Sequence, residues 1–369
     1  MTSPVLFEEL QGEHQQLVGV ATLNSEKTLN SLTLEMVDLL TEKLLQWQSD
    51  DRIAAVFIQG AGEKAFCAGG DVQALHKSSV EQPGGPCEYA ETFFEREYRL
   101  DYLLHVYNKP VIVWGHGIVM GGGLGIFSGC KYRIVTEKTR IAMPEVTIAL
   151  FPDVGGSYFL NHMPGESGRF LALTAASING ADSLYVNMAD YAISHANKQA
   201  VIDVLLSLDW TSEDIDAKLT SFFTAQQRQS AGDMPAGNVE VHQAVIDELC
   251  AGDDVEVIAA RFAALETDDK WLLRAQGGIA NGSPLAIKWI FKQLSLCKDL
   301  SLAEVFKTEV QLATCIVRGT EFAEGVRALL IDKDQSPEWQ FKALSDVTDE
   351  AVDAFFVAPW PQNPLADLS

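Results

Sequence analysis

The sequence predicts an α/β fold over its first half and a mainly helical region over its second half. Short apolar runs of strand length alternate with stretches of helical periodicity up to about residue 195. Beyond that residue, capping signals and apolar positions at helical spacing dominate. Such alternation is typical of sheets that are covered by helices. We therefore expect residues 1–195 to form an α/β core and residues 196–369 to form a mainly α-helical region.

The elements of the first half follow from apolar runs, one cap and one glycine-rich turn. Residues 17–23 (LVGVATL) are typical of a buried strand, and Thr33 is a suitable N-cap for the amphipathic stretch that follows it. Three more apolar runs predict strands, at residues 54–58, 110–114 and 132–135. A helix is expected from Leu124, after a run of glycines.

Helix starts are clearer in the second half. The dipeptide Ser283-Pro284 suits the N-cap and first position of a helix that continues to residue 296. Ser301 and Glu304 have the spacing of a capping box, and Gly319 is placed to end the helix that they open. The sequence contains no repeat or long linker, so the boundary between the two regions is not sharply marked.

The composition excludes several classes of partner. The 369 residues include 27 Lys and Arg against 51 Asp and Glu, a formal net charge of −24. Such a field repels nucleic acids and anionic lipid surfaces, so neither is an expected partner. The excess acid is concentrated in residues 209–269, which hold 14 acidic residues against three basic ones.

The cysteines and the N-terminal residues bear on the compartment. The six cysteines are scattered without a C-x-x-C pair, which favours a reducing compartment and gives no spacing for a metal site. The N-terminal residues lack the pattern of a signal peptide, and no apolar run reaches the roughly 20 residues of a membrane span. We expect a cytoplasmic protein, or one of the mitochondrial matrix if a presequence has been removed.

Two glycine clusters, Ala68-Gly69-Gly70-Asp71 and residues 121–125, stand out as candidate binding turns. Neither continues into the Lys-Ser or Lys-Thr of a phosphate loop, and Met120 interrupts the dinucleotide pattern. Glycines also let a substrate approach backbone N–H groups, so the two turns could form an oxyanion hole. The alternative from spacing alone is that they serve only tight turns and close packing.

Two carboxylates, Glu145 and Asp153, lie within the apolar segment 141–160. In loops such residues are usually solvated or stabilise a turn. If both are buried together, their pKa values separate and they can act as an acid and a base. Glu97 lies on a predicted amphipathic helix, where a surface position is the simpler interpretation.

Three ordered motifs resemble the crotonase (enoyl-CoA hydratase/isomerase) superfamily. They are KAFCAGGD (64–71), HGIVMGGGLG (116–125) and MPEVTIALFPDVGGSYFL (143–160). The run FPDVGG and the segments 179–191 and 325–339 are most similar to the members that hydrolyse short β-hydroxyacyl-CoA thioesters. The resemblance covers most of the chain and is weakest across the acidic segment.

The resemblance implies a crotonase-like spiral of ββα turns, followed by an α-helical region that closes an acyl-CoA site. It implies an oxyanion hole made by the N–H groups of Gly70 and Gly122, and catalytic roles for Glu145 and Asp153. It also implies a substrate-binding site to which Glu97, Gly122, Glu145 and Asp153 contribute, with Glu97 beside the β-hydroxyl group.

One departure from the superfamily discriminates among its activities. Hydratases of the superfamily carry a glutamate two residues after the glycine triplet, and Gly125 stands there instead. Asp153 occupies the position where hydratases have a small residue, as it does in the hydrolases. The resemblance therefore implies hydrolysis of 3-hydroxyisobutyryl-CoA in valine catabolism, with Glu145 as nucleophile or general base. The alternatives are an enoyl-CoA isomerase or hydratase, and a non-catalytic CoA-binding protein.

The implied substrate also sets expectations about partners. CoA enters only as part of the acyl-CoA substrate, so no separate cofactor and no metal is expected. Superfamily members often form trimers or hexamers, which leaves a homo-oligomer open. Basic residues such as Lys64, Arg327 or Lys333 are expected to offset the negative field where CoA enters.

Overall fold

The computed structural model describes residues 3–369 and divides the chain into two compact units. Unit 1 comprises Met1–Gly70, Leu100–Ile141 and Ile178–Gly237. Unit 2 comprises Asp71–Arg99, Ala142–Ser177 and Asn238–Ser369. The two units alternate along the sequence. The division into residues 1–195 and 196–369 concerns successive segments, and it stays a prediction.

Unit 1 is built on a six-stranded sheet with the order β1-β2-β3-β5-β7-β10, and a smaller sheet has the order β4-β6-β8-β9. In the larger sheet β1 is antiparallel to β2, and the other pairs are parallel. The strands are β1 (Val5–Gln11), β2 (Leu17–Leu23), β3 (Ile53–Gly60), β4 (Ala65–Cys67), β5 (Val111–Gly115), β6 (Ile118–Met120), β7 (Tyr132–Val135), β8 (Arg140–Ala142), β9 (Ile178–Asn179) and β10 (Tyr191–Ala192).

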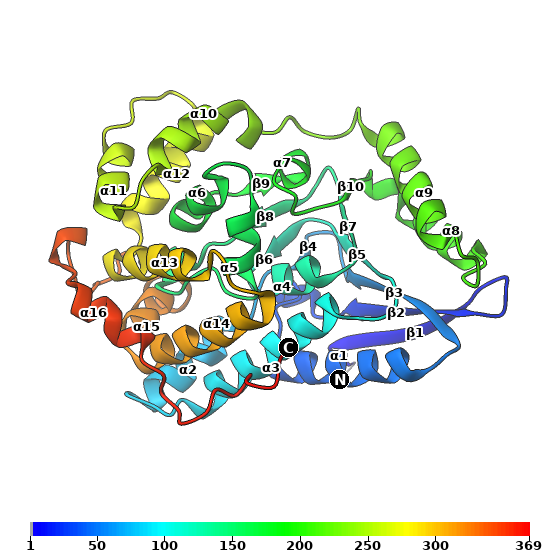
Figure 1. Cartoon of the computed structure of the whole chain (residues 1–369), viewed down its shortest axis with the longest axis horizontal. Coiled ribbons are helices and arrows are strands. Elements are labelled where there is room, and N and C mark those ends of the chain that lie inside the picture. Colours follow the sequence, from blue (N-terminus) through cyan, green and yellow to red (C-terminus); the bar gives the residue numbers. More distant parts are fainter. Residues whose placement is uncertain (1–2) are drawn as a thin grey trace. The chain divides into compact units, whose positions relative to one another are not determined.

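Amphipathic helices cover this sheet. Phe57, Ile112 and Trp114 of the central strands pack in one buried cluster with Leu205 and Phe223, which come from α8 and α9 (Figure 1). The helices of unit 1 are α1 (Leu34–Ser49), α4 (Gly122–Gly129), α7 (Gly180–Tyr185), α8 (Lys198–Ser207) and α9 (Ile215–Ser230), with 3₁₀ turns η1 (Glu26–Thr28) and η4 (His195–Asn197).

Unit 2 is helical. Its helices are α2 (Val72–Glu81), α5 (Gly156–Phe159), α6 (Ser167–Thr174), α10 (Val239–Cys250), α11 (Val255–Ala263), α12 (Lys270–Asn281), α13 (Pro284–Cys297), α14 (Leu302–Arg318), α15 (Glu321–Val326) and α16 (Asp349–Asp353), with short turns η2 (Glu145–Ile148), η3 (Leu160–His162), η5 (Arg327–Ile331), η6 (Leu344–Asp346) and η7 (Ala354–Phe356). Helix α3 (Glu88–His105) begins in unit 2, and the boundary between the units falls within it.

The predicted elements are confirmed, with small shifts at their ends. The strands at 17–23 and 132–135 have the predicted bounds, and those at 54–58 and 110–114 are β3 and β5. Thr33 accepts the Met36 N–H at 3.2 Å, as an N-cap does. Helix α4 begins two residues before Leu124. Strand β1 was not predicted, because only Val5 among its residues is buried.

The acidic segment 209–269 is folded. It forms α9, α10 and α11, and each of these helices buries an apolar side: Leu219 and Phe223 in α9, Ile246 in α10, Ile258 in α11. Most of its acidic residues lie at the caps of these helices and in the loops next to them.

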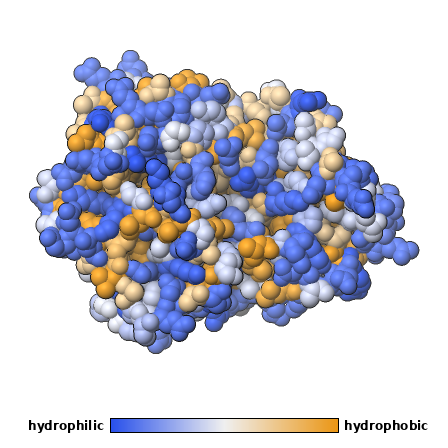
Figure 2. Space-filling model, viewed as in Figure 1, coloured by the Kyte–Doolittle hydropathy of each residue, from blue (hydrophilic) through white to orange (hydrophobic). Residues whose placement is uncertain are grey.

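Hydrophilic residues cover most of the face in view in Figure 2, with apolar residues scattered between them. Among the described residues, none of the helices has the length and hydropathy needed to span a bilayer.

Candidate active site

The segment that carries Glu145 and Asp153 folds as two tight turns in unit 2. Glu145 opens the 3₁₀ turn η2, which ends at Ala149 in the left-handed region with φ of 49°. The Leu150 carbonyl then accepts the indole N–H of Trp289 at 3.1 Å. Although both carboxylates were predicted in loops, each is only 4% exposed. The interpretation as solvated loop carboxylates is therefore excluded by their burial.

Helix α3 places Glu97 and Tyr98 beside these carboxylates. The Tyr98 hydroxyl donates to Asp153 Oδ2 at 2.7 Å. Glu97 is 2% exposed, so its interpretation as a surface residue of an amphipathic helix is wrong. The charges of Asp153 and Glu145 both raise the pKa of Glu97, after burial, which is the largest cause. The structure thus brings together the three carboxylates that the sequence singled out.

The carboxyl groups of this cluster have raised pKa values, because they are buried next to one another without a cationic partner in the described chain. Burial, and then the charge of Asp153, raise the pKa of Glu145 well above its usual value. Burial raises the pKa of Asp153 to about 6, although the hydrogen bond from Tyr98 acts to lower it. Among residues 3–369, no Lys or Arg forms an ion pair with Glu97, Glu145 or Asp153. Several adjacent buried carboxyls cannot all be ionised, so the cluster retains protons near neutral pH.

Two oxygens of the cluster have no hydrogen-bond partner among the residues that the structure describes. These are Glu97 Oε1 and Glu145 Oε2, both fully buried. A buried polar atom left without a partner costs about 1–3 kcal/mol, so such atoms are rare and concentrate at functional sites. Glu97 and Glu145 therefore each have one oxygen available to a substrate or to water.

The two glycine turns are neighbours within unit 1. Gly69 has φ of +110°, and a Cβ there would lie 3.4 Å from the Met120 carbonyl oxygen. A Cβ on Gly123 would lie 2.6 Å from the Cβ of Cys67, so the helix start and the strand end of the two motifs pack closely. Close packing alone would account for these glycines. It does not exclude that their backbone N–H groups also bind a substrate.

The N–H groups of Gly70 and Gly122 are the relevant donors. Gly122 is the first residue of α4, where a helical N–H has no partner within the helix. The Gly69 carbonyl is used by the Leu32 N–H at 2.8 Å. Within the described part of the chain, neither Gly70 nor Gly122 donates a hydrogen bond to another segment. Their use as an oxyanion hole stays a prediction.

Sequence reasoning missed Tyr98 and a fourth buried carboxylate, Glu309. Glu309 lies on α14, is 0% exposed and accepts N–H groups from the segment that follows Asp153. Burial raises its pKa to about 8, while the backbone N–H groups of Gly155 and Ser157 lower it. One signal was available: Glu309 interrupts an otherwise apolar face between Phe306 and Ala313.

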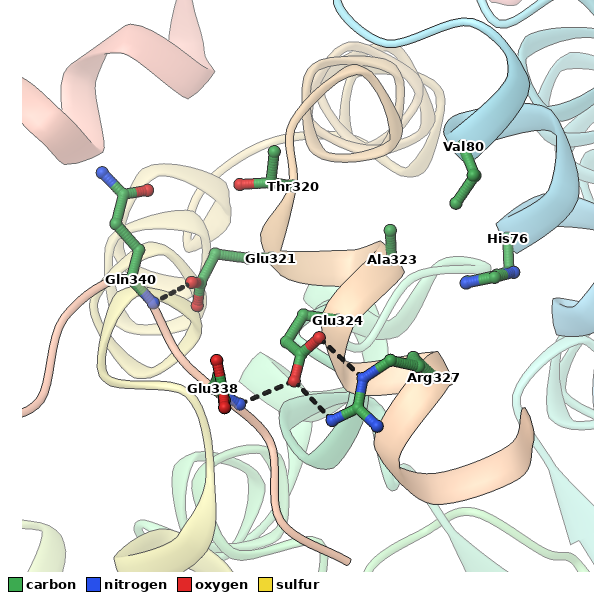
Figure 3. A pocket seen from close by; sticks show the side chains of 9 residues that line it. All are labelled: His76, Val80, Thr320, Glu321, Ala323, Glu324, Arg327, Glu338 and Gln340. Carbon is green, nitrogen blue, oxygen red and sulfur yellow. Dashed lines mark hydrogen bonds and ion pairs between the residues drawn. The ribbon is translucent and has the colours of Figure 1, made fainter. Parts of the chain in front are cut away.

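A separate cavity of about 540 Å³ lies in unit 2 and is lined by His76, Arg327 and several carboxylates (Figure 3). None of the three predicted carboxylates lines it. Arg327 pairs there with Glu324 at 2.8 Å, and it also pairs with Asp332 and Asp334, each at 2.7 Å. Three carboxylates of the chain thus balance the charge of Arg327, and its role where CoA enters stays a prediction. Lys64 and Lys333 are exposed.

A metal centre is not indicated by the arrangement of the side chains. Across residues 3–369, no three His, Cys, Asp or Glu side chains are grouped in a way that could hold a metal ion.

Comparisons with known proteins bear on the whole chain. The family model described as enoyl-CoA hydratase/isomerase matches residues 18–356. The mitochondrial 3-hydroxyisobutyryl-CoA hydrolase of Danio rerio is 38% identical over 354 residues, which are 96% of this chain and 89% of that protein. The protein of that name from Homo sapiens is 36% identical over 352 residues, with 95% and 88% covered.

Two solved structures are also similar over nearly their full lengths. A carnitinyl-CoA dehydratase from Mycobacterium thermoresistibile has a TM-score of 0.85 and 33% identity, with 99% of each chain covered. An enoyl-CoA hydratase from Rhodobacter sphaeroides has a TM-score of 0.82 and 30% identity, with 97% of this chain and 98% of that chain covered.

Proposed function

Since this chain belongs to the enoyl-CoA hydratase/isomerase family, we propose that it is a thioester hydrolase that converts 3-hydroxyisobutyryl-CoA and water to 3-hydroxyisobutyrate and CoA. The fold is that of the crotonase family, an α/β core with a helical C-terminal region. The relatives that carry the name of this hydrolase align with about nine tenths of the chain or more.

One observation supports hydrolysis over the other activities of the family. Asp153 and Glu145 are both buried, and the charge of Asp153 acts with burial to raise the pKa of Glu145. Hydrolysis of a thioester needs one group to take a proton from water and another to protonate the departing thiolate. A cluster that is partly protonated near neutral pH contains both a carboxylate and a carboxylic acid. Gly125 meanwhile stands where hydratases of the family have their first glutamate.

The proposed steps assign a role to each residue. The thioester oxygen accepts the N–H groups of Gly70 and Gly122, which stabilise the negative charge that develops on it. Glu145, as a carboxylate, either attacks the carbonyl carbon to give a mixed anhydride or removes a proton from the attacking water. In the first route the C–S bond breaks as the anhydride forms, the thiolate leaves with a proton from the cluster, and water that Asp153 orients or deprotonates then cleaves the anhydride, which releases the acid and regenerates Glu145. In the second route the attack of water breaks the C–S bond directly, and the thiolate again leaves with a proton from the cluster.

Glu97 is proposed to bind the β-hydroxyl group of the substrate. Its buried Oε1 has no partner in the chain, which suits an acceptor or donor for a hydroxyl. The covalent and general-base routes differ in one measurable respect. In ¹⁸O-labelled water, repeated turnover through an anhydride can place label in the Glu145 carboxylate, whereas direct attack by water places label only in the product.

The substrate class is tested by one set of assays. The protein is incubated with 3-hydroxyisobutyryl-CoA, 3-hydroxypropionyl-CoA, crotonyl-CoA and a 3-enoyl-CoA, while free thiol and double-bond absorbance are followed. We expect thiol release from the first two substrates alone. A change in double-bond absorbance without thiol identifies an isomerase or hydratase, and binding without either signal identifies a CoA-binding protein. The preference between the first two substrates is expected to be small, since one methyl group contributes only about 1–3 kcal/mol.

Glu145→Gln is the first variant to test. It keeps the shape of the side chain but removes the carboxylate, so kcat for thiol release should fall by roughly 100-fold or more. Binding of CoA, measured by calorimetry, should remain. Turnover near the normal rate in this variant would remove Glu145 from the mechanism. Asp153→Asn is also expected to lower kcat for thiol release and to leave CoA binding measurable.

The setting of the reaction is also a proposal. The 3-hydroxyisobutyryl-CoA hydrolases that match this chain are named as mitochondrial, and a step in valine catabolism fits their substrate. A location in the mitochondrial matrix is proposed on that basis, and a cytoplasmic location stays a prediction from the sequence. Acyl-CoA is the proposed partner, and a homo-oligomer stays a prediction that sedimentation of the purified protein would test.

A further inference from the structure

Glu309 binds the chain directly after Asp153 with both of its oxygens. Its Oε2 accepts the N–H of Gly155 at 2.7 Å, and its Oε1 accepts the N–H of Ser157 at 2.9 Å. The side chain is fully buried on α14, more than 150 residues away in sequence. A buried carboxylate that accepts two backbone N–H groups fixes those groups in direction as well as in distance.

The turn that Glu309 binds has an unfavourable backbone. Val154 has φ of +54° and Gly155 has φ of +85°, so two successive residues lie in the left-handed region. A β-branched residue in that region is a true outlier, and such residues persist only where the surroundings impose them. The two hydrogen bonds to Glu309 hold the residues that directly follow Asp153 in this unfavourable conformation.

Two helices contact Asp153 and the turn that follows it. The Tyr98 hydroxyl of α3 donates to the Asp153 carboxylate. Helix α14 packs against the turn, since a Cβ on Gly155 would lie 3.3 Å from the Phe306 ring. The Phe306 and Tyr98 rings also contact, with centroids 5.9 Å apart. The backbone of Asp153 and its side chain are thus held by separate elements.

We propose that Glu309 is a positioning residue that acts through the 154–157 turn to hold the Asp153 carboxyl in its reactive orientation. The inference deepens the proposed function, because it assigns a residue outside the reacting groups to the orientation of one of them. Both carboxylate oxygens of Glu309 accept N–H groups of the turn, so the side chain acts on the turn. A displacement of about 1 Å at a reacting group can lower the rate by roughly 100-fold, so such a residue is expected to be visible in kcat.

The test begins with Glu309→Gln. A glutamine offers one acceptor oxygen and one NH₂ donor, so one of the two backbone N–H groups then faces another donor. We expect kcat to fall by roughly 10- to 100-fold while KM changes by less than about threefold. Glu309→Asp, which keeps the charge but is one methylene shorter, serves as the second variant if the first does not fold.

A double-mutant cycle separates positioning from general damage. If Glu309 acts through Asp153, Glu309→Gln should cost little additional kcat in an Asp153→Asn background. If the two substitutions lower kcat independently, their effects multiply, and the proposal is overturned.

A spectroscopic readout does not depend on activity. The ¹³C carboxyl resonance of Asp153, assigned by its loss in Asp153→Asn, is titrated in the wild type and in Glu309→Gln. Displacement of the turn weakens the Tyr98 bond, so the apparent pKa of Asp153 should rise. The other groups that face Asp153 are Glu97 on α3, Glu145 on η2 and Glu309 itself. Glu97 and Glu145 are unchanged in the variant, but Glu309→Gln also removes a charge that acts on Asp153. Glu309→Asp keeps that charge and is titrated as well, and an unshifted Asp153 titration in Glu309→Asp overturns the positioning role even if the wild type hydrolyses no thioester.

Asp247→Asn is a matched control. Asp247 lies on α10 and accepts the Glu166 N–H at 2.8 Å, next to Gly165, which has φ of +52°. It therefore also binds a left-handed turn of unit 2, but one away from the carboxylate cluster. Asp247→Asn should lower the melting temperature and leave kcat and the Asp153 titration unchanged. If Glu309→Gln behaves in this same way, Glu309 is only structural.

Discussion

At the scale of single residues, Tyr98 opposes the effect of burial on the pKa of Asp153. Its hydroxyl donates to a carboxylate, and this hydrogen bond acts to lower the pKa of Asp153 against the effect of burial. The sequence placed Tyr98 next to a candidate residue but gave no reason to single it out. Only the contact with a residue 55 positions away identifies its role.

Tyr98→Phe removes this hydroxyl and keeps the ring. We expect the pKa of Asp153 to rise by roughly one unit, because a hydrogen bond to a charged group contributes about 1.5–3 kcal/mol. If the reaction needs Asp153 ionised, the acidic limb of the pH profile of kcat/KM should move to higher pH, with activity recovered near pH 8–9. An acidic limb at its original pH would show that Asp153 is not the group that titrates there.

The burial of the carboxylates could not be predicted for a related reason. Glu97 has the sequence surroundings of a surface residue on an amphipathic helix, and Asp153 those of a turn residue. Each is buried because an element distant in sequence covers it. The spacing of apolar residues in the sequence indicates which side of a helix is apolar, but it does not indicate which other element packs against the polar side.

At the scale of elements, the turn that bears Glu145 is held in place by the close approach of α15. A Cβ on Gly325 would lie 2.6 Å from the carbonyl carbon of Ile148, in the same η2 turn as Glu145. The backbone of α15 thus packs directly on η2, with no room for a side chain between them. Gly325 opens the segment 325–339, part of the predicted resemblance, and the packing gives this glycine a physical reason.

Gly325→Ala should therefore displace η2. We expect a loss of about 1–3 kcal/mol in the free energy of unfolding, as for an overpacked core, together with a lower kcat. Chemical denaturation and thiol-release assays measure the two effects.

Gly277→Ala in α12 is the control, since a Cβ there meets only the Asn281 side chain, at 4.0 Å. That variant should be more stable by about 0.5–1 kcal/mol, because alanine favours helix over glycine. Equal behaviour of the two variants would contradict the packing argument.

Elements with local signals were predictable, whereas their association was not. Ser301 and Glu304 form the capping box that their spacing predicted, and Ser283 caps α13. Strand β1 (VLFEELQ) has no regular alternation of apolar and polar residues, and only its Val5 is buried, so no pattern in the sequence marks its pairing with β2. The pairing of two strands depends on the backbone groups of both, and the residue pattern of one strand does not identify its partner.

At the scale of the whole molecule, the buried carboxylates couple stability to pH. The pKa of Glu309 is raised to about 8 in the folded chain, and those of Glu97 and Glu145 are also raised. The folded state then binds more protons than the unfolded state, so stability falls as pH rises toward the folded pKa. Below about pH 6.5 histidines oppose this trend, since burial lowers the pKa of His105 to about 4.

We therefore expect the melting temperature to decrease between about pH 7 and pH 8, above the ordinary pKa of histidine. Differential scanning calorimetry in buffers of equal ionic strength measures the slope. Glu309→Gln should flatten it, since it removes one of the groups responsible. A melting temperature that rises across this range would mean that the cluster is already ionised in the folded protein.

The alternation of the two units along the chain has a consequence for synthesis. Every segment of unit 1 has been made once residue 237 is joined, whereas unit 2 needs residues up to the C-terminus. Domains fold largely in the order in which the ribosome releases them. The turn after Asp153 is therefore made about 150 residues before Glu309, the side chain that binds it. During translation the carboxylate cluster would be among the last parts to form, so a nascent chain with a folded sheet would still be inactive.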